Sequence, residues 1–184
     1  MVATAEKTLL TADDVWNLGE DARVELVRGE LREVAAAGGR HGQVGGQLAG
    51  YLAVYGQHGR VGRVYASETG FVLEKSPTTL LVPDLAFIKV EHLPSGGAPD
   101  WFFETPPDAL LETLSPSQRF GELVEKVGLY LKFGVPLVLA AVPEDKTIFA
   151  FYGDGRIHVY RAGDVLDGGD VLPGFSVPVD DLFL

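Results

Sequence analysis

The sequence predicts an α/β fold in which helices cover one mixed β-sheet, and two observations support this class. The 184 residues are 46% apolar and 22% charged, which is typical of a soluble globular protein large enough to bury one core. Segments with helical and strand periodicity follow one another in the order helix, several strands, helix, strand. We therefore expect one helix to cross between neighbouring strands of a single sheet.

The first part of the chain predicts a short helix, a hairpin and a long helix. Residues 11–14 combine a capping hydroxyl with first-turn acids, as at the start of a helix. Residues 23–34, "RVELVRGELREV", alternate about Arg28-Gly29 as in a β-hairpin. Apolar residues at helical spacing predict a helix over residues 42–55, and its glycines indicate close packing against a sheet.

The rest of the chain consists of short apolar runs bounded by Gly and Pro, which are typical of strands, and one segment with helical period that ends at a glycine. The expected elements are strands at 62–67, 70–75 and 80–88, a Gly/Pro-rich loop at 90–107, a strand at 108–114, a helix at 118–133, a buried strand at 135–142 and a hairpin at 146–160.

Composition argues against several classes of protein. Without cysteine the chain cannot form disulfides, thiolate metal sites or a cysteine nucleophile. The N-terminus lacks a basic start followed by an apolar core, and the longest apolar runs are too short to cross a bilayer, so we expect a cytoplasmic protein with no membrane partner. A net charge of −11 opposes nonspecific binding to polyanions.

One segment departs from this acidic average. Residues 34–67 contain no acidic residue, but they hold Arg40, Arg60 and Arg63 together with two histidines. If any face of the protein meets nucleic acid, we expect these three arginines to contact its phosphates. A chance gap in the acidic residues is the alternative interpretation.

Two carboxylates interrupt apolar runs, Asp84 in "LLVPDLAFI" and Glu112 in "ALLETL". A buried carboxylate is usually protonated, paired or bound to a cation, because leaving it charged and unpaired is costly. If the two strands pair, alternation lets both side chains approach one point, beside the backbone carbonyl of Thr113. These oxygens would suit Mg²⁺ or Mn²⁺, which prefer oxygen ligands.

Lys126 lies on the helix that follows Glu112 and could orient or deprotonate a water, or stabilise developing charge on a phosphate. Two interpretations without catalysis remain open. Lys126 could form an exposed i, i+4 pair with Glu122, which contributes about 0.3–0.5 kcal/mol. Alternatively, the two carboxylates could be a structural pair bonded to arginines such as Arg119.

The chain also resembles a known family. The motifs that carry the resemblance are, in order, "VELVRGEL", "RHGQ", "VPDLAFI", "PDALLETLSPS", "EKVGLY", "FGVP" and "LPGFSVPVDDLF". They are similar to the Uma-type bacterial restriction endonucleases of the PD-(D/E)XK nuclease superfamily, over about residues 11–183. The resemblance implies a restriction-endonuclease-like αβββαβ core, here within a single nuclease-like domain, residues 1–184, whose core spans about 40–143. An N-terminal and a C-terminal hairpin would be additions to it.

The resemblance implies Mg²⁺- or Mn²⁺-dependent hydrolysis of phosphodiester bonds, with DNA as the expected partner. By position, Asp84 and Glu112 match the motif carboxylates, and with Thr113 they would bind the metal. Leu114 stands where the superfamily commonly has a lysine; in this family the lysine comes from the following helix, at the position of Lys126.

Three further residues match polar positions of the family pattern and are candidate accessory residues: Glu25, His41 and Glu122. The pattern is broken at Val142, where the family usually has an aspartate. That change and the acidic charge favour the alternative function, a non-catalytic module that binds nucleic acid or protein. We expect a homodimer, since cutting a duplex requires access to two strands.

Overall fold

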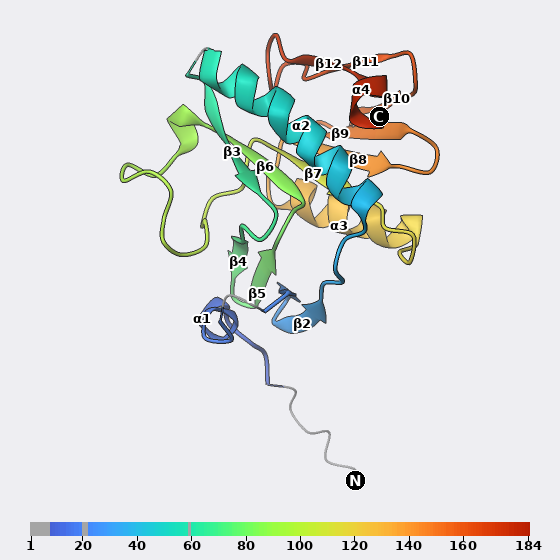
Figure 1. Ribbon diagram of the computed structural model, residues 1–184. Helices are drawn as coiled ribbons and strands as arrows, with labels where there is room; N and C mark the ends of the chain where they lie inside the picture. Colours follow the sequence, from blue (N-terminus) through green and yellow to red (C-terminus); the bar gives the residue numbers. More distant parts are fainter. Residues whose placement is uncertain (1–7, 20–21, 59) are drawn as a thin grey trace.

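The computed structural model describes residues 8–19, 22–58 and 60–184, which form a six-stranded main sheet covered by helices on both faces, a four-stranded second sheet and a small two-stranded sheet (Figure 1). The main sheet has six strands in the order β10-β9-β8-β7-β6-β3. Strands β7 and β8 pair in parallel, whereas the other neighbours are antiparallel. The strands are β3 (Gly62–Ala66), β6 (Leu85–Lys89), β7 (Ala109–Thr113), β8 (Leu137–Val142), β9 (Thr147–Tyr152) and β10 (Ile157–Tyr160).

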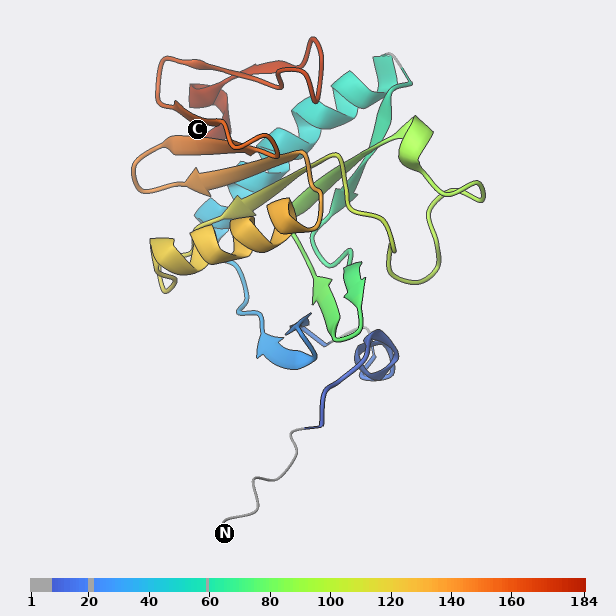
Figure 2. The same ribbon diagram turned by 180° about the vertical axis from the view of Figure 1, so that it is seen from behind.

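Helices α2 (Gly39–His58) and α3 (Phe120–Lys132) cover opposite faces of the main sheet (Figures 1 and 2). Successive residues of β7 point to alternate faces, so Leu111 packs in the core under α2 and Leu110 in the core under α3. Glu112 shares the face of Leu110, as alternation predicted. The strand therefore points one carboxylate into the layer between the sheet and α3.

The expected αβββαβ core is confirmed. Along the chain, the main sheet and its two helices follow one another as α2, β3, β6, β7, α3, β8. The parallel pairing of β7 and β8 follows from α3, because a parallel connection needs a crossover that a helix can supply. The predicted C-terminal hairpin is formed by β9 and β10 and extends the main sheet beyond β8.

The second sheet contains the predicted N-terminal hairpin, β1 (Val24–Val27) and β2 (Glu30–Glu33). Its two-residue turn has Arg28 at φ 54° and Gly29 at φ 79°, the left-handed conformation that a tight hairpin of type I′ requires. The strand order is β2-β1-β5-β4, and α1 packs on this sheet. The remaining elements are α1 (Ala12–Trp16), β4 (Phe71–Lys75) and β5 (Thr78–Leu81).

The prediction of a single strand over residues 80–88 is wrong. The segment forms two strands in different sheets, β5 and β6, joined by a bend at Val82, Pro83 and Asp84. Proline has no N–H to donate and restricts the residue before it, so Pro83 favours a break at this point. Asp84 consequently lies where the chain enters the main sheet, and not within a continuous strand.

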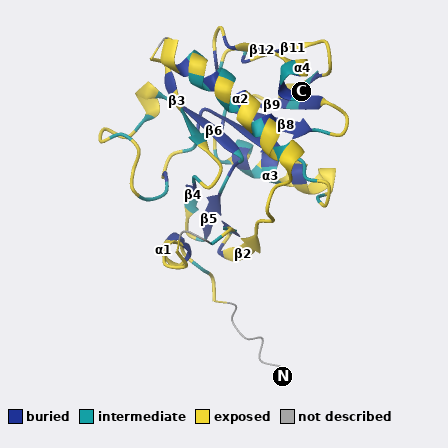
Figure 3. Cartoon of the chain, in the orientation of Figure 1, coloured by how far each residue is buried: buried dark blue, intermediate teal, exposed yellow. Residues whose placement is uncertain are grey.

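Helix α2 is three residues longer at each end than the predicted 42–55. The expected packing role of its glycines is wrong for Gly42, Gly46 and Gly50, because a side chain there would meet open space. Gly56 does lie against the carbonyl of Gly62. The sheet contacts the opposite, leucine-bearing face of the helix, and Figure 3 shows the outer face exposed.

The C-terminal segment packs over α2, partly through a hydrogen bond from the Tyr51 hydroxyl to Asp181. Within the described part of the chain, no helix is both long and apolar enough to span a membrane. The remaining elements are the 3₁₀ turn η1 (Val90–His92), β11 (Val165–Asp167), β12 (Ser176–Pro178) and α4 (Val179–Leu182).

Candidate active site

Pairing of β6 with β7 brings Asp84 next to Glu112, as the sequence predicted. Leu85 is opposite Leu111, and continuing this antiparallel register places Asp84 opposite Glu112. One carboxylate oxygen of Asp84, Oδ2, accepts a hydrogen bond from the backbone N–H of Thr113 at 2.6 Å. The bend before β6 therefore holds the first carboxylate against the end of the strand that carries the second.

Helix α3 adds a buried cation. The Lys126 Nζ atom lies 2.8 Å from Glu112 Oε1 and 2.8 Å from Glu25 Oε1, and its side chain is 16% exposed. The predicted alternative, an exposed pair with Glu122, is wrong because the ion pairs of Lys126 within the described residues are these two buried ones. One ammonium thus bridges a carboxylate of the main sheet and one of the second sheet.

Glu25 connects the second sheet to this cluster. It lies on β1 and is 6% exposed. Its Oε1 atom accepts hydrogen bonds from the Val82 N–H and from Lys126, both at 2.8 Å. Lys126 also donates to the Val82 carbonyl at 3.4 Å. The bend that carries Asp84 is therefore fastened on both its N–H and its carbonyl.

Tyr130 also reaches the cluster, from the apolar face of α3 that packs on the main sheet. Its hydroxyl donates to Glu112 Oε1 at 2.8 Å, and the residue is fully buried. The available signal was its position four residues after Lys126, which places both side chains on one face of α3. An aromatic residue at an apolar position of a helix usually indicates core packing, so periodicity alone does not predict this hydrogen bond.

His41, in the first turn of α2, contacts the other carboxylate. Its Nε2 atom lies 3.1 Å from Asp84 Oδ2, and the two side chains are 14% and 25% exposed, respectively. The hydrogen bond to Asp84 raises the pKa of His41, although burial opposes this effect, and the charge of Glu112 and the backbone of Thr113 add smaller increases. The ring thus lies within the field of both carboxylates.

Burial dominates the electrostatics around Glu112. It raises the pKa of Glu112 from 4.5 to about 7; the charge of Lys126 opposes this, while the charges of Asp84 and Glu25 add to it. Burial by itself lowers the pKa of Lys126, but the charges of Glu112 and Glu25 outweigh it and raise the pKa above its ordinary value. Lys126 is therefore an ammonium at neutral pH. It faces the carboxylates of Glu25 and Glu112.

The remaining predicted residues lie outside this cluster. Glu122 is exposed, and its Oε2 atom accepts the Arg119 N–H at 3.2 Å at the start of α3. In the described chain, the ion-pair partners of Asp84 and Glu112 are His41 and Lys126, so the alternative of arginine pairing is wrong.

The three predicted basic residues, Arg40, Arg60 and Arg63, are exposed. Arg40 is next to His41 at the start of α2, whereas Arg60 follows its end. Twenty helical residues rise roughly 30 Å, so the two arginines mark opposite ends of the helix. Of the three arginines, Arg40 is the one next in sequence to a residue of the carboxylate cluster, His41.

The donor set of this site fits a hard divalent cation. Among the described residues, no group of three or more His, Asp or Glu side chains is placed to hold a metal, so a cation at Asp84 and Glu112 would need its other ligands from the backbone, water or substrate. Protein donors contact Asp84 Oδ2 and Glu112 Oε1, whereas Asp84 Oδ1 and Glu112 Oε2 have no hydrogen bond to the described chain. Mg²⁺ commonly binds one or two carboxylates together with substrate phosphates.

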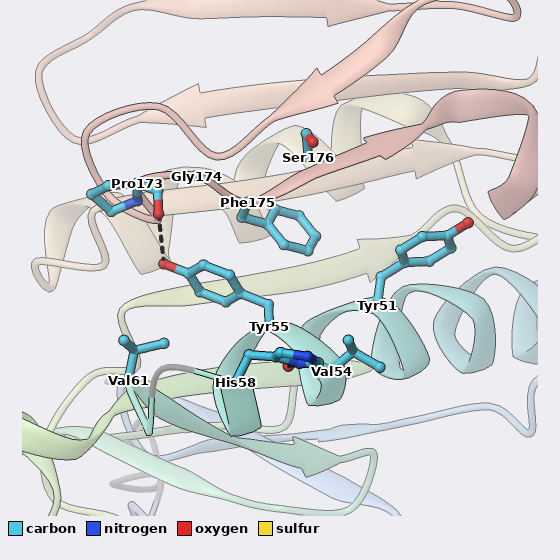
Figure 4. Close-up of a pocket in the computed structure, with 9 residues that line it drawn as sticks. All are labelled: Tyr51, Val54, Tyr55, His58, Val61, Pro173, Gly174, Phe175 and Ser176. Atoms are coloured by element: carbon cyan, nitrogen blue, oxygen red, sulfur yellow. Dashed lines mark hydrogen bonds between the residues drawn. The ribbon is translucent and has the colours of Figure 1, made fainter.

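A cavity of about 670 Å³ lies elsewhere, between α2 and residues 173–176 (Figure 4). Tyr51, Tyr55 and Phe175 line it, and the Tyr55 hydroxyl donates to the Pro173 carbonyl at 3.2 Å. It contains no carboxylate side chain and none of the predicted site residues. The cavity is therefore separate from the carboxylate cluster at the junction of the main and second sheets.

Comparison with known proteins identifies a family and a solved structure that this chain resembles. The sequence model of the Uma2 family, described as "Putative restriction endonuclease", matches residues 11–180. A crystal structure described as a "putative nuclease belonging to DUF820" from Anabaena variabilis superposes with a TM-score of 0.81 at 18% sequence identity, and the match covers 95% of this chain and 97% of that one. A search of curated proteins finds no significant match. The structural likeness establishes the shared fold.

Proposed function

Since the chain belongs to the Uma2 restriction endonuclease family, we propose that it is a divalent-metal-dependent endonuclease that hydrolyses phosphodiester bonds of DNA. One observation carries the proposal: Asp84 and Glu112 lie side by side, and each has one oxygen held by protein donors and the other without one in the described chain. A structural pair would have its oxygens satisfied internally. This arrangement instead leaves two hard ligands for a cation. The choice of DNA is supported by the description of the family.

Asp84, Glu112 and the carbonyl of Thr113 would hold Mg²⁺ or Mn²⁺. Such an ion, when bound, polarises a phosphate oxygen and lowers the pKa of a coordinated water. The protein prepares the ligands beforehand. The Thr113 N–H and His41 hold Asp84, and buried donors on α3 hold Glu112, so little side-chain freedom remains to be lost on binding.

Lys126 would act as a fixed hydrogen-bond donor. Its ammonium is held 2.8 Å from each of Glu25 and Glu112, and its raised pKa keeps it protonated, so it is unsuited to remove a proton. A positive donor in this place can orient the attacking water and stabilise negative charge that develops on the phosphate. Glu25 would serve as its anchor on the second sheet.

The nucleic acid would approach across the exposed start of α2. Arg40 adjoins His41 there, and a duplex lying along the helix would reach Arg60 and Arg63 about one turn of DNA further on. The lack of acidic residues in 34–67 favours this path over the rest of the acidic surface. A homodimer would supply a second site for the second strand, and sedimentation analysis of the wild type tests this.

Metal-dependent cleavage tests the proposal directly. Supercoiled DNA, single-stranded DNA and RNA would each be incubated with the wild type, Asp84→Asn and Glu125→Gln, with Mg²⁺, with Mn²⁺ and with chelator. Glu125 is an exposed acid next to Lys126, so its variant matches the charge change outside the cluster. We expect cleavage by the wild type and Glu125→Gln only with metal, and a loss of at least about 100-fold in Asp84→Asn.

Two results would contradict the proposal. Cleavage that persists in Asp84→Asn would show that the activity does not come from this site. Metal-independent binding of nucleic acid, with no cleavage of any substrate and no Mn²⁺ binding in calorimetry, would favour the non-catalytic module.

A further inference from the structure

The Tyr130 hydroxyl is a buried polar group that would not contact the metal or the substrate in the proposed reaction. Tyr130 is 0% exposed, and it packs in the core that α3 shares with the main sheet. Its hydroxyl donates to Glu112 Oε1 at 2.8 Å, and this is its hydrogen bond within the described chain. Because the hydroxyl is sealed from solvent, no water can take the place of Glu112 as its acceptor if the carboxylate turns away.

The hydroxyl and the ammonium of Lys126 both bind the same oxygen of Glu112, each at 2.8 Å. They play different parts, because Lys126 also binds Glu25 and the Val82 carbonyl. The ammonium can shift toward those partners, whereas the hydroxyl donates to Glu112 as its one acceptor within the described chain. Two donors on one oxygen leave Oε2, the other oxygen of Glu112, as the atom free to accept a new ligand.

We propose that Tyr130 is a positioning residue that holds Glu112 by Oε1, and thereby presents Oε2 toward Asp84 as a ligand for the divalent cation. This inference rests on the proposed metal site and adds to it the residue that orients one ligand. Hydrogen bonds to the ligands of a metal fix their orientation, and loss of one typically reduces metal affinity 10–100-fold.

The variant Tyr130→Phe isolates the hydroxyl. The ring is retained, so the core packing persists, as does the contact in which Lys126 Nζ lies 5.9 Å from the ring centroid. Tyr160→Phe is the matched control: Tyr160 is also buried, but it belongs to the core on the other face of the sheet, and its hydroxyl bonds the Asp167 carbonyl at 3.4 Å. Val127→Ala loosens the packing of α3 and leaves the hydroxyl in place.

The experiment is calorimetric titration of Mn²⁺ into the four folded proteins, with their melting temperatures measured in metal-free buffer. We expect the Mn²⁺ dissociation constant of Tyr130→Phe to rise 10–100-fold. Tyr160→Phe and Val127→Ala should stay within about twofold of the wild type, even though Val127→Ala lowers the melting temperature more.

Affinity in Tyr130→Phe that equals or exceeds that of the wild type would overturn the inference, because Glu112 would then need no such donor. An equal loss in Val127→Ala would also overturn it, since general loosening of α3 would explain the effect. These outcomes differ from failure of the proposed function, in which the wild type itself binds no Mn²⁺.

Discussion

The two ends of β7 each carry a buried carboxylate, and their surroundings differ. Asp108 immediately precedes the strand and is 4% exposed, while Glu112 lies near its end and is 5% exposed. Both oxygens of Asp108 have donors: the Lys89 N–H at 2.8 Å and His92 Nδ1 at 2.8 Å. Glu112 has two donors on one oxygen and none on the other within the described chain.

The difference separates a structural acid from a candidate ligand. Burial is nearly equal at the two ends, so exposure cannot distinguish them. Asp108 ties the end of β6 to η1 through both of its oxygens, whereas Glu112 Oε2 has no donor within the described chain. A fully paired buried acid should affect stability alone, and a half-paired one should affect metal binding.

The largest expected effect comes from removing the cation at the Glu112 end. Lys126→Met leaves Glu25 and Glu112 buried without their shared ammonium. Because breaking a buried ion pair exposes an uncompensated charge to a low-dielectric interior, the free energy of unfolding should fall by about 3–5 kcal/mol at pH 8. Urea denaturation checks this. Part of the loss should be recovered at pH 5.5, where Glu112 takes up a proton, and a pH-independent loss would contradict the assignment.

The second effect is the pH dependence of stability in metal-free buffer. The folded pKa of Glu112 is about 7, above the ordinary 4.5, so the folded state binds the extra proton between these values. Stability from this group is therefore greatest below pH 4.5 and is lost as pH rises to 7, by on the order of 3 kcal/mol. The raised pKa of Lys126 adds no slope here, since its contribution is complete below 10.5.

Glu112→Gln provides the comparison for that measurement. The difference in free energy of unfolding between the wild type and this variant should fall steadily between pH 4.5 and 7 and level off above. Denaturant titrations at half-unit intervals of pH would resolve it. A difference that stays flat through this window would show that Glu112 ionises normally in the folded protein.

The smallest expected effect on stability comes from neutralising the carboxylate at either end of β7. Asp108→Asn places an amide against a hydrogen-bond donor, so we expect it to lower the free energy of unfolding by about 1.5–3 kcal/mol and to leave Mn²⁺ affinity within twofold. Glu112→Gln should lower the Mn²⁺ affinity at least about 100-fold, with a change in stability near 1 kcal/mol at pH 7. Equal effects of both variants on Mn²⁺ would remove the distinction between the two ends.

The apolar periodicities were enough to predict the order of elements, the N-terminal hairpin and the alternation along β7. These depend on local preferences, because side chains repeat every two residues in a strand and about every 3.6 in a helix. The motifs around Asp84, Glu112 and Lys126 were likewise visible, since charged residues stand out within apolar runs. The resemblance to the nuclease family rested on the same short segments.

Other features depended on contacts between distant segments. The bend at Pro83 separates β5 from β6, and local patterns cannot show which sheet each strand joins. Lys126 binds Glu25, about a hundred residues away in the chain, in place of its helical neighbour Glu122. Tyr130 has the spacing of a core residue, and its hydrogen bond to Glu112 depends on the packing of α3 on β7.

The sequence by itself determined which chemical groups are present and on which elements they lie, because period and composition are local properties. The tertiary structure decided which carboxylate oxygens have donors within the described chain and which have none. That distinction arises because the main sheet, the second sheet and α3 pack around one point, where burial raises the pKa of Glu112 and two donors reach a single carboxylate oxygen. Partners in space, and not neighbours in sequence, decide whether a buried acid is structural or available for binding.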